Sequence, residues 1–213
     1  MERVLARLLD HVALWVADRD AAAERLLELT GVHVVDRNER FTLLGADARR
    51  GKLTFFAAEG PRERGALRHV ALRVSNGEEA EHDLGEGLTL QVVRASTDVE
   101  WDLDSVGLFS RDPERTAKEY LRLGFVEATP RDGAPRVEVG GAFVEFYEGD
   151  VAETERPLLN HIGVLSDRAD DAKDLGVEVA DVVDAPNTYA VFVWGPERVK
   201  IEYVEHKPTF SLV

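Results

Sequence analysis

Two glutamates stand among apolar residues in short segments that we predict to be strands. Glu145 lies in segment 142–147 and Glu202 in segment 200–204, 57 positions further along. Side chains alternate between the two faces of a strand, so a carboxylate set among large apolar residues is costly to bury unless it is paired or binds a cation. The pattern therefore leaves two interpretations, a cation ligand or a carboxylate on the solvent face of a half-exposed sheet.

The composition limits what chemistry the chain can do. Without cysteine it has no disulfide, zinc finger, iron–sulfur cluster or catalytic thiol, so His, Asp, Glu, Gln, Asn or backbone oxygen must hold any metal. A formal charge of −15, from 41 acidic and 26 basic residues, repels nucleic acid and anionic membranes, and we expect neither as a partner. No apolar run approaches membrane-spanning length, and the start of the chain lacks the features of a signal peptide. We expect a cytoplasmic protein.

A short pattern occurs four times along the 213 residues. It consists of a polar residue, then His or Ser, then a β-branched, a small and an aliphatic residue. Its copies are residues 10–16, 68–74, 104–110 and 160–166, with His11, His69, Ser105 and His161 at the second position. His11 and His69 are 58 positions apart, and Ser105 and His161 are 56 apart. Such self-similarity indicates one repeated structural unit.

The segments after each copy also repeat. Helical stretches are predicted at 20–29 and 112–123, with a shorter one at 167–175, and each ends near a glycine. Asp112 suits an N-cap and Pro113 the first helical position. Alternating strand segments come next, at 32–35, 52–57, 126–128, 136–139, 142–147, 177–183, 189–194 and 199–204. The sequence therefore predicts an α+β protein of four βαβββ units, the second one shortened.

This pattern resembles the vicinal oxygen chelate superfamily, over residues 8–206. The family includes glyoxalase I, the bleomycin-resistance proteins and the extradiol dioxygenases. The strongest local match is the last unit, which opens with Asn160-His161-Ile162-Gly163 and closes with Trp194-Gly195-Pro196-Glu197-Arg198-Val199-Lys200-Ile201-Glu202-Tyr203. The resemblance implies that two units pair into one cupped mixed sheet. We therefore expect two halves, 1–100 and 101–213, each forming one cup.

In the family, metal ligands come from the first and last strands of each paired unit. The resemblance thus implies a site in the C-terminal cup at Glu145, His161 and Glu202, with Ser105 at the fourth position. The N-terminal cup offers a weaker second site at His11, His69 and Gln91, with Thr54 at the remaining position and Glu100 as the alternative to Gln91. The alternative for this second cup is a set of polar residues left from an ancestral duplication.

One imidazole with two carboxylates suits a divalent metal such as Fe(II), Mn, Zn or Ni, and the sequence does not choose among them. Such an ion can act as a Lewis acid on oxygens of a small substrate, and Glu145 or Glu202 would be the catalytic base. The resemblance implies a metal-dependent lyase, isomerase or dioxygenase acting on vicinal oxygens. Ser105 replaces a histidine of the ring-cleaving enzymes, which disfavours extradiol cleavage.

Two alternatives stay open. One is a metal-free protein that binds or sequesters a small molecule, as in the bleomycin-resistance branch of the family. The other is a structural or regulatory module whose cups are filled by side chains. With two cups in one chain, both a monomer and a homodimer are compatible with the sequence.

Overall fold

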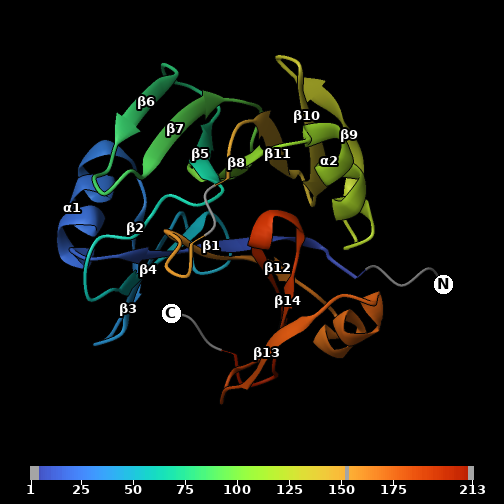
Figure 1. The fold of residues 1–213 in the computed structure, drawn as a ribbon. Coiled ribbons are helices and arrows are strands. Elements are labelled where there is room, and N and C mark those ends of the chain that lie inside the picture. The colour runs from blue at the N-terminus through green and yellow to red at the C-terminus, as the bar shows by residue number, and fades with distance from the viewer. Residues whose placement is uncertain (1–4, 152–153, 211–213) are drawn as a thin grey trace.

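The computed structural model describes residues 5–151 and 154–210, which form two mixed β-sheets (Figure 1). The larger sheet has eight strands in the order β13-β14-β15-β12-β1-β4-β3-β2. The smaller sheet has seven strands in the order β6-β7-β5-β8-β11-β10-β9. None of the helices in the described part of the chain is long and apolar enough to cross a membrane.

The eight-stranded sheet combines the first and the fourth unit. The first unit supplies β1 (Leu8–Val16), β2 (His33–Arg37), β3 (Phe41–Gly45) and β4 (Lys52–Ala57). The fourth unit supplies β12 (Leu159–Leu165), β13 (Val179–Asp184), β14 (Thr188–Trp194) and β15 (Lys200–His206). The prediction missed β3. In each unit the first strand pairs in parallel with the last, as β1 does with β4 and β12 with β15.

The seven-stranded sheet combines the second and the third unit in the same way. The second unit supplies β5 (Leu67–Val74), β6 (Ala80–Asp83) and β7 (Thr89–Arg94). The third unit supplies β8 (Asp102–Ser110), β9 (Val126–Arg131), β10 (Ala134–Val139) and β11 (Ala142–Glu148). The second unit has three strands and no helix, which confirms that it is shortened.

Helices follow the first strand of the other three units. They are α1 (Arg19–Leu29), α2 (Pro113–Leu121) and the 3₁₀ helix η1 (Ala169–Leu175), and a second 3₁₀ helix, η2, spans Pro196–Arg198. Asp112 caps α2 as predicted, because its side chain accepts a hydrogen bond from the Arg115 amide. At the start of α1, Asp18 does the same for the Ala21 amide.

The expected pairing of neighbouring units into cups is wrong. The first strand of unit one, β1, pairs with β12 of unit four, and β5 of unit two pairs with β8 of unit three. The expected boundary near residue 100 therefore falls between β7 and β8, which belong to the same sheet. All four first strands carry the same apolar pattern, so the pattern alone allows more than one choice of partner.

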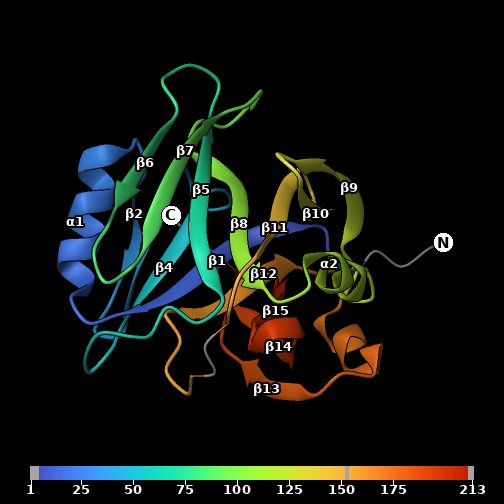
Figure 2. The same ribbon diagram turned by 45° about the horizontal axis from the view of Figure 1, so that its top comes forward.

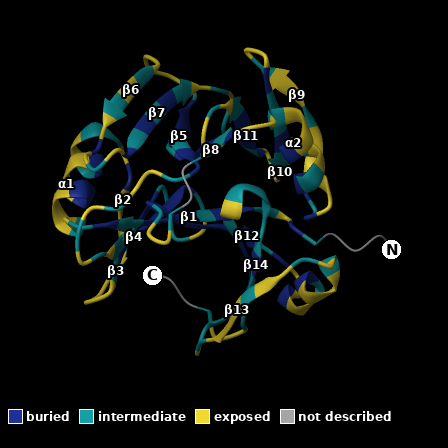
Figure 3. Cartoon of the chain, viewed as in Figure 1, coloured by how far each residue is buried: buried dark blue, intermediate teal, exposed yellow. Residues whose placement is uncertain are grey.

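The two sheets share one core. Alternate residues of the central strands, such as Val12 and Leu14 in β1 and Val70 and Leu72 in β5, belong to a single buried cluster. Figure 3 shows the buried central strands and the more exposed rim, which includes β9 and β13. Because strand side chains alternate, His11 and His69 point to the opposite faces, away from this core. The two cups therefore open on opposite sides of a shared interior.

Candidate metal centre

Three potential metal ligands converge on the cup face of the eight-stranded sheet. His11, His161 and Glu202 come from β1, β12 and β15, which lie side by side in the middle of the molecule (Figure 2). The His11 Nε2 atom lies 2.9 Å from His161 Nε2 and 2.9 Å from Glu202 Oε2. His161 Nε2 lies 3.0 Å from the same Glu202 oxygen. The three atoms thus form a nearly equilateral triangle.

Strand register places these side chains on one face. Gly163 is opposite His11 in the β1–β12 pair and opposite Glu202 in the β12–β15 pair, while His161 is opposite Ala13. A Cβ atom on Gly163 would stand 2.6 Å from His11 Nδ1 and 2.9 Å from His11 Nε2. The imidazole of His11 therefore occupies the space that a side chain at Gly163 would need.

The residue before each histidine fixes the orientation of its ring. His11 Nδ1 lies 2.8 Å from Asp10 Oδ2, and His161 Nδ1 lies 3.2 Å from Asn160 Oδ1. Both partners are acceptors, so each Nδ1 carries a proton and directs Nε2 toward the triangle. Lys52 completes this arrangement, since its Nζ lies 2.8 Å from Asp10 in a buried ion pair.

The charges of the site are strongly coupled. Burial would raise the pKa of Glu202, but the two nearby imidazoles outweigh it and hold that pKa well below its usual range. Burial would lower the pKa of His11, but Glu202 and Asp10 outweigh it and raise the pKa to about 9. Burial lowers the pKa of His161, with only partial opposition from Glu202. The site therefore favours a positive charge next to Glu202.

The triangle matches the geometry of a metal centre. Ligands in adjacent octahedral positions at about 2.1 Å from an ion lie about 3.0 Å apart, whereas tetrahedral ligands lie about 3.4 Å apart. The observed edges of 2.9, 2.9 and 3.0 Å agree with the octahedral value. Glu202 Oε2 is buried and makes no well-directed hydrogen bond within the described residues, which leaves its lone pairs available. The three residues therefore fit a divalent cation bound on one triangular face.

Aromatic side chains form the walls around the triangle. The Phe192 ring lies 5.1 Å from the His161 ring, and the Phe56 ring lies 6.5 Å from it. Phe56 also contacts Trp15 and Phe41, with ring centroids 5.2 and 5.8 Å away. These four aromatic residues are only partly buried, so they offer an apolar surface of inclined rings beside the polar triangle.

The other predicted ligands lie elsewhere. Glu145, predicted to stand beside His161 and Glu202, lies instead in β11 of the seven-stranded sheet, near His69. Gln91 lies in that sheet too and donates a hydrogen bond to Glu81, while Glu100 accepts one from the Ser75 amide. His11, predicted for a separate weaker site, joins the main triangle.

Thr54 occupies the fourth position of the main cup. It is opposite Ala13 in the parallel pair of β1 and β4, as His161 is opposite Ala13 in the antiparallel pair. Sequence reasoning missed the roles of Asp10, Asn160 and Lys52. The signal for the first two was present, because an acceptor side chain directly precedes each of the two histidines.

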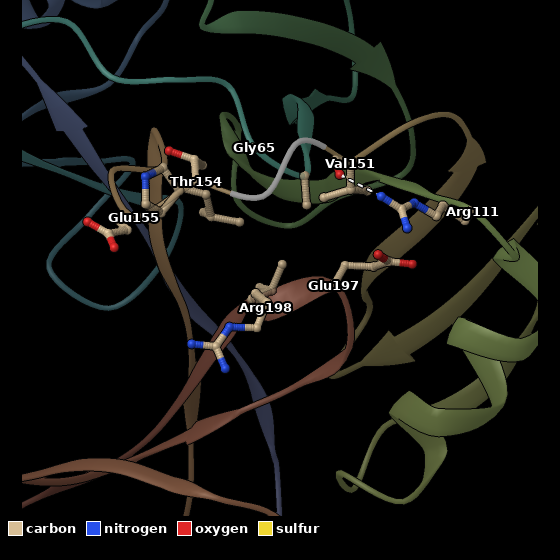
Figure 4. Close-up of a pocket in the computed structure, with 11 residues that line it drawn as sticks. Gly65, Arg111, Val151, Thr154, Glu155, Glu197 and Arg198 are labelled. Atoms are coloured by element: carbon tan, nitrogen blue, oxygen red, sulfur yellow. Dashed lines mark hydrogen bonds between the residues drawn. The ribbon is translucent and has the colours of Figure 1, made fainter.

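A cavity of about 610 Å³ lies apart from this site (Figure 4). Its lining includes Arg111, Val151, Glu197 and Arg198, and the Arg111 guanidinium donates a 3.4 Å hydrogen bond to the Val151 carbonyl. None of the triangle residues lines it. We therefore assign it no part in the metal chemistry.

Known structures share this architecture over nearly the whole chain. Glyoxalase I from Zea mays matches with a TM-score of 0.70 at 16% sequence identity, covering 93% of this chain and 92% of that one. A Bacillus subtilis subsp. subtilis str. 168 protein named as a "putative dioxygenase" matches with a TM-score of 0.70 at 13% identity, over 96% of this chain and 86% of that one. No family model matches the sequence, and no curated protein matches it.

These similarities establish the fold. The chain has the glyoxalase-like fold, as the resemblance of its repeats implied. More particularly, it has the two-module form, in which one chain carries two cupped sheets.

Proposed function

We propose that the protein is a divalent-metal-dependent enzyme whose metal is held by His11, His161 and Glu202. The observation that supports this proposal is the triangle of ligand atoms with edges of 2.9, 2.9 and 3.0 Å. Its substrate is a small molecule with two neighbouring oxygens, which would take the ligand positions that the protein leaves open. The partly exposed aromatic walls favour a substrate with an apolar or aromatic body.

Two histidines and one carboxylate on one face of an ion are typical of non-haem Fe(II) oxygenases. Mn, Zn and Ni remain compatible with the same donors. Ser105, the residue that disfavoured ring cleavage, is not in this cup, and His11 supplies the second imidazole. A glyoxalase-like lyase or isomerase is less favoured, because Thr54 at the fourth position offers no second carboxylate as a base. We therefore infer a dioxygenase that cleaves an aromatic diol.

The bound ion would supply Lewis acidity and bring dioxygen and the diol together. The reaction places both atoms of O₂ in the product as one ring carbon–carbon bond breaks, so it consumes no external reductant. The protein supplies orientation. Asp10 and Asn160 keep the Nε2 lone pairs of His11 and His161 directed inward, and the rings of Phe56 and Phe192 lie beside His161, where they would contact an aromatic substrate.

Metal analysis of matched variants tests the site. Protein produced with iron supplementation and handled without oxygen should contain close to one metal ion per chain. Glu202→Gln should lose most of it, whereas Glu145→Gln, a buried glutamate of the other sheet, should retain it. Equal metal content in the two variants would contradict the assignment.

The reaction is tested separately. Iron-loaded protein should consume O₂ with a catechol series, one O₂ per diol, and the ring-opened product should absorb in the visible range. If metal binding depends on Glu202 but no catechol causes O₂ uptake, the metal-site assignment is retained and the dioxygenase assignment is refuted. In that case, metal-dependent isomerisation of a hemithioacetal would support the lyase and isomerase alternative.

A further inference from the structure

The second cup carries a changed copy of the metal centre. In the seven-stranded sheet, Gly107 is opposite His69 and Glu145, as Gly163 is opposite His11 and Glu202. The two remaining equivalent positions hold Ser105 and Gln91, both of which pair with Ala71. One histidine and one glutamate of the triad are thus retained, and the second histidine is replaced by serine.

An arginine reverses the tautomer of the remaining histidine. His69 Nδ1 lies 2.9 Å from Arg68 Nη1, and a guanidinium can only donate hydrogen bonds. Nδ1 therefore accepts, and Nε2 carries the proton. At the equivalent position of the first cup, Asp10 accepts from His11 and leaves Nε2 free for a metal. Burial, together with Arg68 and Arg131, lowers the pKa of His69 to about 3, so the ring stays neutral.

One arginine pairs with the retained glutamate of this cup, and a second stacks on a neighbouring tyrosine. Arg131 Nη1 lies 3.3 Å from Glu145 Oε1 and 2.7 Å from the buried Asp104 carboxylate. The Arg68 guanidinium stacks on Tyr147, 3.9 Å from the ring centre, and the Tyr147 hydroxyl donates a 2.9 Å hydrogen bond to Glu145. These contacts use only some of the five N–H donors of each guanidinium.

A cavity of about 600 Å³ is lined by Arg68, Gln91, Arg131, Glu145 and Tyr147, together with Arg94 and the acidic residues Glu79, Glu81 and Asp132. Three buried polar atoms in this cup lack a hydrogen-bond partner among the residues that the structure describes: His69 Nε2, Ser105 Oγ and Glu145 Oε1. The three residues are at most 1% exposed. Unpartnered buried polar atoms are rare in folded proteins and need an explanation, and of these three residues Glu145 also lines the cavity.

We propose that the second cup is a metal-free binding site for a small carboxylic acid that carries a hydroxyl or amino group next to its carboxylate. Arg68 and Arg131 would bind the carboxylate through their remaining N–H donors, which match carboxylate geometry. The neighbouring hydroxyl or amino group would donate to Glu145 Oε1, a buried acceptor of a residue that lines the cavity. A simple carboxylate would bring no hydrogen-bond donor to Glu145 Oε1 and should bind more weakly.

Calorimetry with three matched acids tests this proposal. Mandelate, phenylglycine and phenylacetate differ only in the group next to the carboxylate, which is hydroxyl, amino or hydrogen. The protein is first treated with EDTA, so that no metal in the first cup binds the acids, and Glu202→Gln is titrated in parallel. Mandelate or phenylglycine should bind at least ten times more tightly than phenylacetate, and equally well to the Glu202→Gln variant.

Variants of the two arginines locate the site. Arg68→Met and Arg131→Met should each weaken binding at least tenfold, whereas Arg115→Met, on the exposed face of α2, should not change it. Two variants are used so that, if one of them fails to fold, the other still tests the proposal. Absence of binding for all three acids, or binding unaffected in a folded arginine variant, would overturn the proposal.

Nitrogen NMR tests the tautomer on the wild-type protein. Two-bond ¹H–¹⁵N correlations of the metal-free protein should show His69 protonated at Nε2. Arg68→Asn should move that proton to Nδ1, since asparagine precedes His161 in the first cup and can accept. A wild-type His69 protonated at Nδ1 would contradict the metal-free assignment, whatever the acids do.

Discussion

Matched glycine-to-alanine substitutions in the two cups can distinguish a specific loss of metal binding from the general loss of stability caused by overpacking a sheet. Gly163 faces His11 in the first cup, and Gly107 faces His69 in the second. An added Cβ would stand 2.6 and 2.9 Å from Nδ1 and Nε2 of His11, and 2.5 and 2.9 Å from the same atoms of His69. The two sites are therefore closely matched in the steric clash that alanine would create.

These distances set the magnitude of the effect. Non-bonded heavy atoms prefer separations of about 3.5 Å or more, so the imidazole must move by roughly 0.5 to 1 Å. Metal ligands tolerate only about 0.2 Å of misplacement. Gly163→Ala should therefore weaken metal binding by at least about 10- to 100-fold, the range seen when groups that orient a ligand are removed. Overpacking should cost each variant about 1 to 3 kcal/mol of stability.

Metal affinity is measured by competition with a chromophoric chelator, using Co(II) or Mn(II) to avoid oxidation. Thermal unfolding of the metal-free variants measures the loss of stability that overpacking causes in both of them. We expect similar losses of stability for Gly163→Ala and Gly107→Ala, with the loss of metal affinity confined to Gly163→Ala. If both variants bind metal like the wild type, or lose it equally, the proposed role of His11 as a ligand is refuted.

Three further perturbations test other parts of the structure. Asp10→Ala leaves the Lys52 ammonium buried without its partner, so chemical denaturation should show a loss of about 3 to 5 kcal/mol, and an unchanged stability would contradict the buried pair. The pKa of His69 is lowered to about 3. Between about pH 6.5 and 3 the unfolded chain therefore binds a proton that the folded chain does not, so the free energy of unfolding should decrease as the pH is lowered. From pH 6.5 to 5 this loss amounts to about 1.6 kcal/mol, which the wild type should show and His69→Gln should not. Asp112→Ala removes the cap of α2 and should lower stability by about 1 kcal/mol without changing metal content.

The sequence by itself determined the repeated unit and most of its elements. The fourfold pattern around His11, His69, Ser105 and His161 led to the right fold, because each copy encodes the same apolar face and the same change from strand to turn. Asp112 and Pro113 marked the start of α2 for local reasons that need no tertiary context. His161 and Glu202 were also placed together correctly, since they belong to the first and last strands of one unit.

Only the tertiary structure decided which units share a cup. Identical apolar patterns let the first strand of any unit pair with that of another, so Glu145 was assigned to the wrong cup and His11 to the weaker one. A steric detail distinguishes the observed pairs. His11 and His69 both belong to His-Val-Ala segments, and each faces a glycine of its partner strand, Gly163 or Gly107, where the ring takes the space of a missing side chain. Pairing the first unit with the second would have set both rings against alanine.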